Sequence, residues 1–215
     1  GLGRAPGTDM HTLGRALRRD AHAAERFPED VKELQGYFSG KSLVPGVQAI
    51  PGVNTHVPLY ILGSSMFGAS LAAKYGLPYA FASHFAPDAL VDAVAAYRSQ
   101  FQPSEQLSEP YVIAAVNVIV SEDAQDAARQ LEASQRSRVR AMVGRGREFT
   151  EEEMDMVMAS PAASQVLHMI SYTGAGTPDT VVDYLHRFAE HADADELMIS
   201  PTATRQPCLL YTSPS

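Results

Sequence analysis

The stretch PLYILGSSMFGASLAAKYGLPYAFASH, residues 58–84, decides the fold. Its first part, Pro58–Leu62, is an apolar run with the length of a strand. The turn Gly63-Ser64-Ser65 follows, and its small residues allow a sharp change of direction while offering two hydroxyls and uncovered amides. The pattern therefore predicts a strand that ends in a small-residue turn.

A helix and a second strand complete this unit. Residues Ala69–Tyr75 are helix-prone, and Gly76 with Pro78 just beyond it is typical of a helix end. The apolar run Tyr79–Ala82 is the next strand. A connection this compact favours two parallel strands joined by a right-handed crossover, as in α/β folds.

Ser64 and Ser65 consequently fall between the carboxyl end of a strand and the amino end of a helix. Free amides and the helix dipole both favour a bound anion at such a place. Two interpretations stay open on the residues alone: an anion-binding turn, or a plain turn of small residues.

Composition limits the class of protein. The chain has 215 residues, of which 45% are hydrophobic and 20% charged, as in an ordinary globular domain. The net charge of −8 argues against nucleic acid as the main partner. No apolar run approaches the ~20 residues of a membrane span, and the single cysteine, Cys208, excludes a disulfide framework or a cysteine-rich metal site. We expect a cytoplasmic protein without a metal or a membrane partner.

The rest of the chain repeats the strand-helix pattern. The segment 149–171 carries acids and four methionines and is expected to form short helical pieces over the surface, for which a lid is one interpretation. The segment 172–179 is expected to be a small-residue loop before a helix, with Gly174–Thr177 as a secondary anion-site candidate. Further helices are predicted at 27–38, 86–101, 122–143 and 180–191, and further strands at 111–120 and 194–200.

The two ends of the chain are unusual. The first residues, Gly1–Thr8, form a glycine-rich loop that resembles a dinucleotide fingerprint only loosely, because its glycines have the wrong spacing. The chain has no initiator methionine, which suggests a fragment of a longer protein. We expect one partial domain over residues 1–204 and a foreign or disordered tail over residues 205–215.

Several segments together resemble the bacterial-luciferase-like family of flavin-dependent monooxygenases. The likeness is strongest over 58–65 and 76–85, where the turn and both strands match, and it extends over nearly the whole chain to about Thr204. Other matching segments are 1–8, 27–31, 97–98, 103–104, 110–112, 117–118 and 194–198.

The resemblance implies an α/β fold, a (β/α)₈ TIM barrel of the luciferase-like type. A full barrel needs about 250 residues, so the chain would hold the C-terminal half to two-thirds of an incomplete barrel, beginning at the end of the fourth strand. Strands five to eight are then expected at 59–62, 79–82, 111–120 and 196–199.

The same resemblance assigns candidate site residues. Ser64 and Ser65, with Gly63, match the positions that contact the FMN phosphate. Arg4 matches an arginine that approaches the flavin, or is a surface arginine, and Gly3 and Ala5 would leave room for the ring system.

His84 is the catalytic candidate, because it ends the sixth strand on the active-site face and could contact substrate or carry a proton. A hydrogen-bonded loop histidine is the alternative. Ser83 is adjacent, and Asn117 lies within an apolar strand, where its amide lines the barrel interior or binds a core water.

The implied function is an FMN-dependent monooxygenase that uses reduced FMN and O₂ on a small-molecule organic substrate. A separate flavin reductase would supply the reduced flavin, and the full-length protein is expected to be a homodimer. Two alternatives are an F420-dependent oxidoreductase and a non-catalytic flavin-binding barrel. The fragment itself is expected to lack strands that hold the flavin ring, and the substrate is not named by the sequence.

Overall fold

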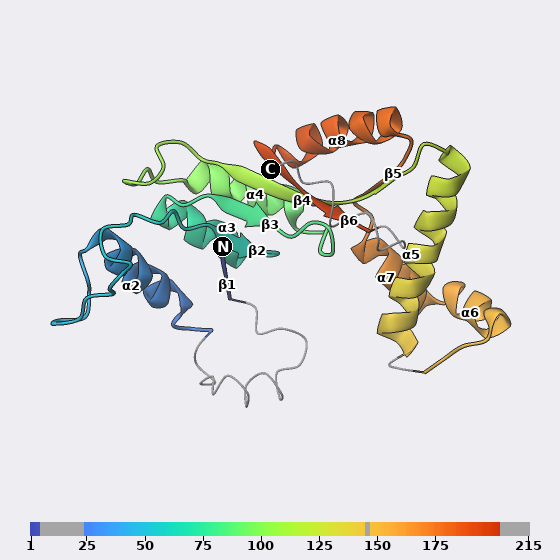
Figure 1. Ribbon diagram of the computed structural model, residues 1–215, viewed down its shortest axis with the longest axis horizontal. Coiled ribbons are helices and arrows are strands. Elements are labelled where there is room, and N and C mark those ends of the chain that lie inside the picture. The colour runs from blue at the N-terminus through green and yellow to red at the C-terminus, as the bar shows by residue number, and fades with distance from the viewer. Residues whose placement is uncertain (5–23, 145–146, 203–215) are drawn as a thin grey trace. The chain divides into compact units, whose positions relative to one another are not determined.

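The computed structural model describes residues 1–4, 24–144 and 147–202 (Figure 1). The predictions for Ala5 and for the tail 205–215, which includes Cys208, fall outside the described residues. The chain divides into two compact units. The first comprises Gly1–Ala80 with Asp92–Val112, and the second comprises Phe81–Val91 with Ile113–Ser215.

The first unit is built on three neighbouring strands in the order β1-β2-β3. Parallel pairing places Leu2 opposite Ile61 and Gly3 opposite Leu62. Helix α3 connects β2 to β3, which confirms the predicted strand-helix-strand unit. The elements are β1 (Leu2–Gly3), α2 (Phe27–Ser39), β2 (Ile61–Gly63), α3 (Met66–Tyr75), β3 (Tyr79–Phe81), which ends at the unit boundary, and α4 (Leu90–Gln100).

Tyr97 of α4 joins that helix to the starts of two strands. Its side chain is fully buried. Its hydroxyl donates to the Leu77 carbonyl at 2.9 Å and accepts the Tyr111 N–H at 3.0 Å. Its ring lies 5.6 Å from that of Tyr79. A buried hydroxyl with both partners satisfied fixes the helix against the backbone as well as burying apolar area.

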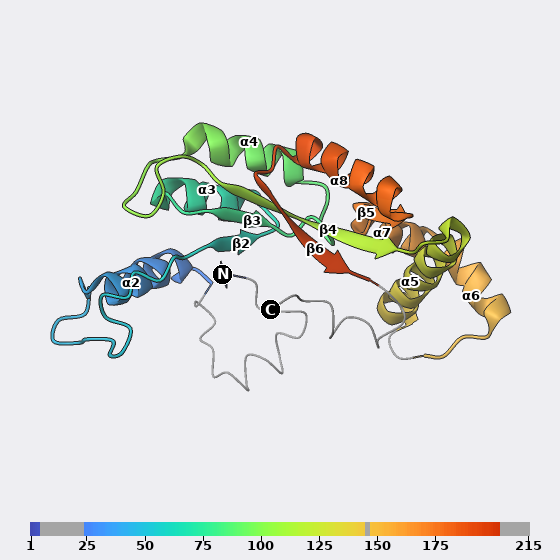
Figure 2. The same ribbon diagram turned by 45° about the horizontal axis from the view of Figure 1, so that its top comes forward.

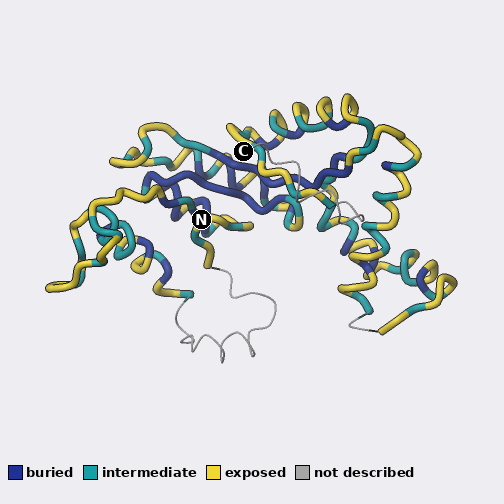
Figure 3. Tube along the Cα trace, in the orientation of Figure 1, coloured by how far each residue is buried: buried dark blue, intermediate teal, exposed yellow. Residues whose placement is uncertain are grey.

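The second unit is built around β4 (Val112–Val120), whose first eight residues are buried (Figure 3). This strand pairs in parallel on both edges, with β5 (Thr173–Gly176) and with β6 (Glu196–Pro201) (Figure 2). The Asn117 N–H donates to the Tyr172 carbonyl at 3.0 Å, whereas the Val118 carbonyl accepts from Thr202 at 3.0 Å. Successive residues of a strand point their backbone groups to opposite edges, so β5 and β6 lie on opposite sides of β4.

Strand β5 corrects the sequence-based prediction of a loop over 172–179. Gly, Ala and Thr in the run Thr173–Gly176 carry little strand propensity, so the pattern gave no strand signal. The strand forms because its backbone pairs with Asn117–Val120. Gly174 also lets the Tyr184 ring approach closely, since a Cβ there would lie 2.6 Å from that ring.

Four helices complete the second unit. Between β4 and β5 lie α5 (Ala124–Gly144), α6 (Glu151–Met158) and α7 (Pro161–Met169), and α8 (Pro178–Ala192) connects β5 to β6. The short helices α6 and α7 confirm the helical pieces predicted in 149–171. They pack on α5 through a small apolar cluster of Val139, Met154, Ala163 and Val166.

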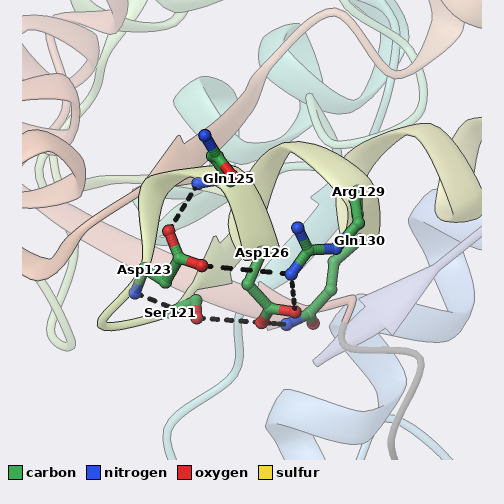
Figure 4. Close-up of polar contacts among 6 residues, drawn as sticks. All are labelled: Ser121, Asp123, Gln125, Asp126, Arg129 and Gln130. Carbon is green, nitrogen blue, oxygen red and sulfur yellow. Dashed lines mark hydrogen bonds and ion pairs between the residues drawn. The ribbon is translucent and has the colours of Figure 1, made fainter.

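Helix α5 begins at Ala124 instead of the predicted residue 122, because the side chain of Asp123 caps its start. The Asp123 carboxylate accepts the Gln125 N–H at 2.9 Å, as a capping side chain does (Figure 4). The Ser121 hydroxyl instead donates to Asp126 at 2.9 Å. Asp126 also accepts from Gln130 and Arg129, and these hydrogen bonds, with that to Gln130 the strongest, hold the pKa of its carboxyl below the usual value.

Two glycines allow a matched test of the packing at the end of α3. Gly76 has φ +60°, and a Cβ there would lie 2.5 Å from the Gln102 carbonyl. Gly46 has φ +76° with nothing within 4 Å. We expect Gly46→Ala to cost about 1–2 kcal/mol of unfolding free energy through backbone strain, and Gly76→Ala to cost about 1–3 kcal/mol more through overpacking. Chemical denaturation of the full-length protein measures both, and equal costs would contradict the packing seen at Gly76.

Candidate functional site

The turn Ser64-Ser65 lies where the sequence placed it, between the end of β2 and the start of α3. Both serines are exposed. Ser65 is the N-cap residue of α3 in an extended conformation, with φ −154° and ψ 166°, and its side chain forms no capping hydrogen bond. The first amides of a helix have no partners within the helix. The turn therefore leaves its hydroxyls available beside the positive end of the α3 dipole.

Tyr79 fixes the backbone of this turn through a hydrogen bond. The Tyr79 hydroxyl donates to the Ser65 carbonyl at 3.0 Å, and burial raises the pKa of that phenol well above its usual value, so it stays protonated as a donor. Gly63 and Gly68 make the close approach of β2 and α3 possible, because a Cβ on Gly68 would lie 3.2 Å from the Tyr79 ring. The turn is thus positioned by rigid elements, as a binding site requires.

Arg4 is brought to the same turn by strand pairing. Gly3 of β1 lies opposite Leu62 of β2, so Arg4 follows its strand at the edge where Ser64 follows β2. The Arg4 guanidinium lies 3.8 Å from the centre of the Phe67 ring, in the first turn of α3. This cation–π contact holds a positive charge beside the helix start. The structure therefore brings Gly3, Arg4, Gly63, Ser64 and Ser65 together.

Helix α3 differs from the other described helices in how its start is satisfied. Five of them carry an acidic residue in the first turn, and α7 is capped by the Ser160 hydroxyl, which accepts the Ala163 N–H at 3.2 Å. Within the described residues, α3 alone has neither an acid nor a capping side chain. The site is consequently suited to an external anion.

The second candidate region is a cavity of about 650 Å³ within the second unit. It lies against β4, β5, β6 and one side of α5. Its lining is His84, Asn117, Leu131, Ser134, Ser137, Arg138, Ala141, Ile170, Thr173, Ser200 and Thr202. The structure thus places the predicted His84 and Asn117 together at one cavity.

His84 is held at this cavity through its backbone. The buried Asn117 amide donates to the His84 carbonyl at 2.6 Å, which gives the mid-strand amide a partner. The His84 ring lies edge-on to Phe85 at 4.8 Å. Its Nδ1 is buried and has no hydrogen-bond partner among the described residues. Burial, and next the charge of Arg138, lower the pKa of His84, so its ring is neutral at pH 7.

Two other site candidates predicted from the sequence, Ser83 and Gly174–Thr177, stabilise the fold. The fully buried Ser83 hydroxyl donates to the Ala115 carbonyl at 2.5 Å, so it is committed to the core. The secondary candidate Gly174–Thr177 is mostly strand β5, and the Thr177 hydroxyl pairs with that of Thr180 at 3.0 Å.

No group of three or more potential metal ligands occurs in the described part of the chain. Within those same residues, none of the helices has the length and apolar character to cross a membrane.

Sequence reasoning missed the residues that α5 contributes to the cavity. Ser134, Arg138 and Ala141 recur at helical spacing along one face, but that face carries no apolar stripe by which a pattern could identify it. Their distance from His84 along the sequence did not indicate a shared site either. Only the folded structure brings this part of α5 and His84 to the same cavity.

A parallel α/β fold with a candidate anion site at a strand end describes many proteins, and comparison with known proteins narrows the class of protein. The chain belongs to the luciferase-like monooxygenase family, which it matches over residues 2–195. It is 41% identical over 204 residues to the uncharacterized protein YvbT of Bacillus subtilis (strain 168), and 36% identical over 202 residues to a luciferase-like monooxygenase of Escherichia coli (strain K12). Both alignments cover 93% of this chain and 60% of the relative.

Solved structures show the same fold. The crystal structure of apo-MsnO8 superposes with a TM-score of 0.77 at 27% identity, covering 95% of this chain and 62% of that one. The coenzyme F420-dependent tetrahydromethanopterin reductase of Methanopyrus kandleri shares the fold with a TM-score of 0.53 at 15% identity, over 93% of this chain and 66% of that one. The chain is thus part of a luciferase-like TIM barrel, and it spans about 60% of the length of the curated relatives it matches.

The electrostatic coupling between Arg138 and His84 is directly measurable. Removing the charge with Arg138→Gln should raise the pKa of His84, because a neighbouring cation disfavours the imidazolium. Arg140→Gln removes a charge from the same helix outside the cavity lining and should leave the pKa of His84 nearly unchanged. An NMR titration of the His84 ring protons, assigned with a His84→Gln variant, measures both. Equal responses in the two arginine variants would show that the local geometry is wrong.

Proposed function

We propose that the chain is the phosphate-binding part of a flavin-dependent monooxygenase that uses reduced FMN and O₂ on a small organic substrate. One observation carries the proposal. The turn Ser64-Ser65 stands at an α3 start that has no acid and no capping side chain, with the Arg4 guanidinium held beside it. Membership of the luciferase-like family supports the FMN phosphate as this anion.

The donor set fits a phosphate monoester. Two hydroxyls, the amides of the α3 start and one guanidinium are all hydrogen-bond donors, and charge-assisted bonds of this kind are the strong ones. Gly63 and Gly3 add no side chain at the strand ends, so the backbone can be approached. Arg4 would balance part of the phosphate charge while its stacking on Phe67 fixes its direction.

Bound reduced FMN would supply the electrons for O₂ activation, which is chemistry that no side chain provides. The chain's own residues would position and protect. His84, neutral at pH 7, can accept or return a proton at its unpaired Nδ1. Asn117 fixes the backbone that carries His84. Helices α6 and α7 pack on α5, and we propose that this layer acts as the lid that excludes water.

Partners follow from the same proposal. A separate flavin reductase would deliver reduced FMN, since the loop Gly1–Gly7 departs from a dinucleotide fingerprint. The full-length protein would act as a homodimer, as the family resemblance implies.

F420 is the competing cofactor, because an F420-dependent reductase shares the fold. Direct binding of FMN and F420 to the full-length protein separates the two cofactors. Turnover separates an enzyme from a flavin carrier: substrate-dependent O₂ uptake with reduced FMN supports the monooxygenase, and bound flavin without substrate-dependent O₂ uptake contradicts it.

The proposed phosphate site is tested by comparing the binding of FMN with that of riboflavin, which lacks the phosphate. Replacing both serines, Ser64→Ala with Ser65→Ala, should weaken reduced-FMN binding at least tenfold, because hydrogen bonds to a charged group contribute about 1.5–3 kcal/mol each. Riboflavin binding should change little. Anaerobic titration of the full-length protein by fluorescence measures both.

The control is Ser70→Ala, which changes an exposed serine of α3 beyond its first turn and should leave both affinities as they are. A double serine variant that loses FMN and riboflavin equally would place the phosphate elsewhere.

A further inference from the structure

The cavity beside β4 has an unusual charge balance for a chain of net charge −8. Among the described residues, its lining contains one permanent cation, Arg138, and one titratable group, His84, but no aspartate or glutamate. Arg138 forms no ion pair or hydrogen bond with any residue that the structure describes. The cations Arg129, Arg136 and Arg147 of the same region, by contrast, each pair with a carboxylate at 3.1 Å or less.

The polar groups of the lining are mostly donors or can act as donors. Ser134 and Ser137 flank Arg138 on α5, and Ser200 contributes a hydroxyl from β6, whereas the Thr202 hydroxyl already donates to the Val118 carbonyl at 3.4 Å. His84 adds a buried ring nitrogen without a partner in the described part of the chain. A buried polar atom without a partner is costly, so a ligand that supplies one gains that free energy.

Part of the lining is apolar and adjoins these polar groups. Leu131, Ala141 and Ile170 provide aliphatic surface, and serine and alanine along α5 keep the space open. A volume of about 650 Å³ is in the range of small-molecule pockets. The cavity therefore matches a molecule with one anionic end and a short aliphatic body.

We propose that this cavity binds a small aliphatic carboxylate, with the carboxylate on Arg138 and its aliphatic part against Leu131, Ala141 and Ile170. A planar carboxylate suits a guanidinium because two parallel hydrogen bonds can form. A single cation balances a monoanion, whereas a phosphate dianion would leave a charge uncompensated. That such a carboxylate is the molecule oxygenated rests on the function proposed above; that the cavity binds it does not.

His84 would report on the ligand directly. Arg138 and His84 are the charged and titratable groups among the described residues of the lining, and the charge of Arg138 disfavours protonation of His84. A carboxylate placed against Arg138 offsets that charge, so binding should raise the pKa of His84. By linkage, carboxylate affinity should then increase as pH falls through the pKa of His84 in the complex.

The experiment uses the flavin-free full-length protein with hexanoate and hexan-1-ol as matched probes, followed by NMR of the His84 ring and by calorimetry. Hexanoate should bind in the millimolar range or tighter and raise the pKa of His84, whereas hexan-1-ol should bind at least tenfold more weakly. Arg138→Gln should weaken hexanoate binding at least tenfold, Arg138→Lys should restore part of it, and Arg140→Gln should stay within twofold of the parent protein.

The contrary outcomes are equally definite. Equal binding of hexanoate and hexan-1-ol, or full hexanoate affinity in Arg138→Gln, overturns the proposal. Displacement of hexanoate by a lower concentration of inorganic phosphate would show a phosphate site instead. Because Arg138 is exposed on α5, its variants should fold, and an unchanged amide spectrum verifies this. Failure of the flavin proposal would appear separately, as absence of reduced-FMN binding with hexanoate binding intact.

Discussion

The hydrogen bond from the Asn117 amide to the His84 carbonyl, 2.6 Å long, is the contact on which the second unit's cavity depends. Strand β4 is buried along eight residues, and its backbone groups are used by neighbouring strands on both edges. A polar side chain in such a strand must find a partner or destabilise the fold. Asn117 finds it in the segment after β3, and so the requirement of the core also fixes the position of His84.

Ser83 adds a second restraint of the same kind, since its buried hydroxyl donates to the Ala115 carbonyl. Two adjacent residues are therefore tied to β4, one by its side chain and one by its carbonyl. The backbone at His84 is therefore fixed, whereas neither of these hydrogen bonds uses the His84 ring. A side chain on a rigid support with one unsatisfied nitrogen is better placed for chemistry than one on a mobile loop.

Much of this arrangement could be predicted from the sequence. The elements of residues 58–82, the long strand β4 and the last strand β6 all carry local signals: apolar runs of strand length, a Gly-Leu-Pro stop and a small-residue turn. Family resemblance then assigned Ser64, Ser65 and His84 to one edge of a barrel. The predicted strands and helices formed because local pattern and tertiary structure agree there, whereas the binding and catalytic roles assigned to Ser64, Ser65 and His84 stay predictions.

The rest depended on contacts that no local pattern encodes. Strand β5 consists of Thr, Gly and Ala, and it forms only because β4 offers it a paired backbone. The stacking of Arg4 on Phe67 needs β1 and α3 side by side, although the two residues are far apart in sequence. Arg138 lies on a helix whose cavity-facing side is small and polar, so periodicity could not separate that side from a solvated one.

The net charge of the chain and the charges around each candidate site lead to different conclusions about which partners the chain can bind. A total of −8 makes nucleic acid an unsuitable partner, yet charges beyond a Debye length of about 8 Å are largely screened at physiological salt. What a small anion meets is therefore decided by its nearest neighbours. At α3 these are a helix start without acids and the Arg4 guanidinium, and in the cavity they are Arg138 and serine hydroxyls, with no carboxylate among the described lining residues. An acidic chain can thus carry the two anion sites proposed above, because its described carboxylates lie outside both.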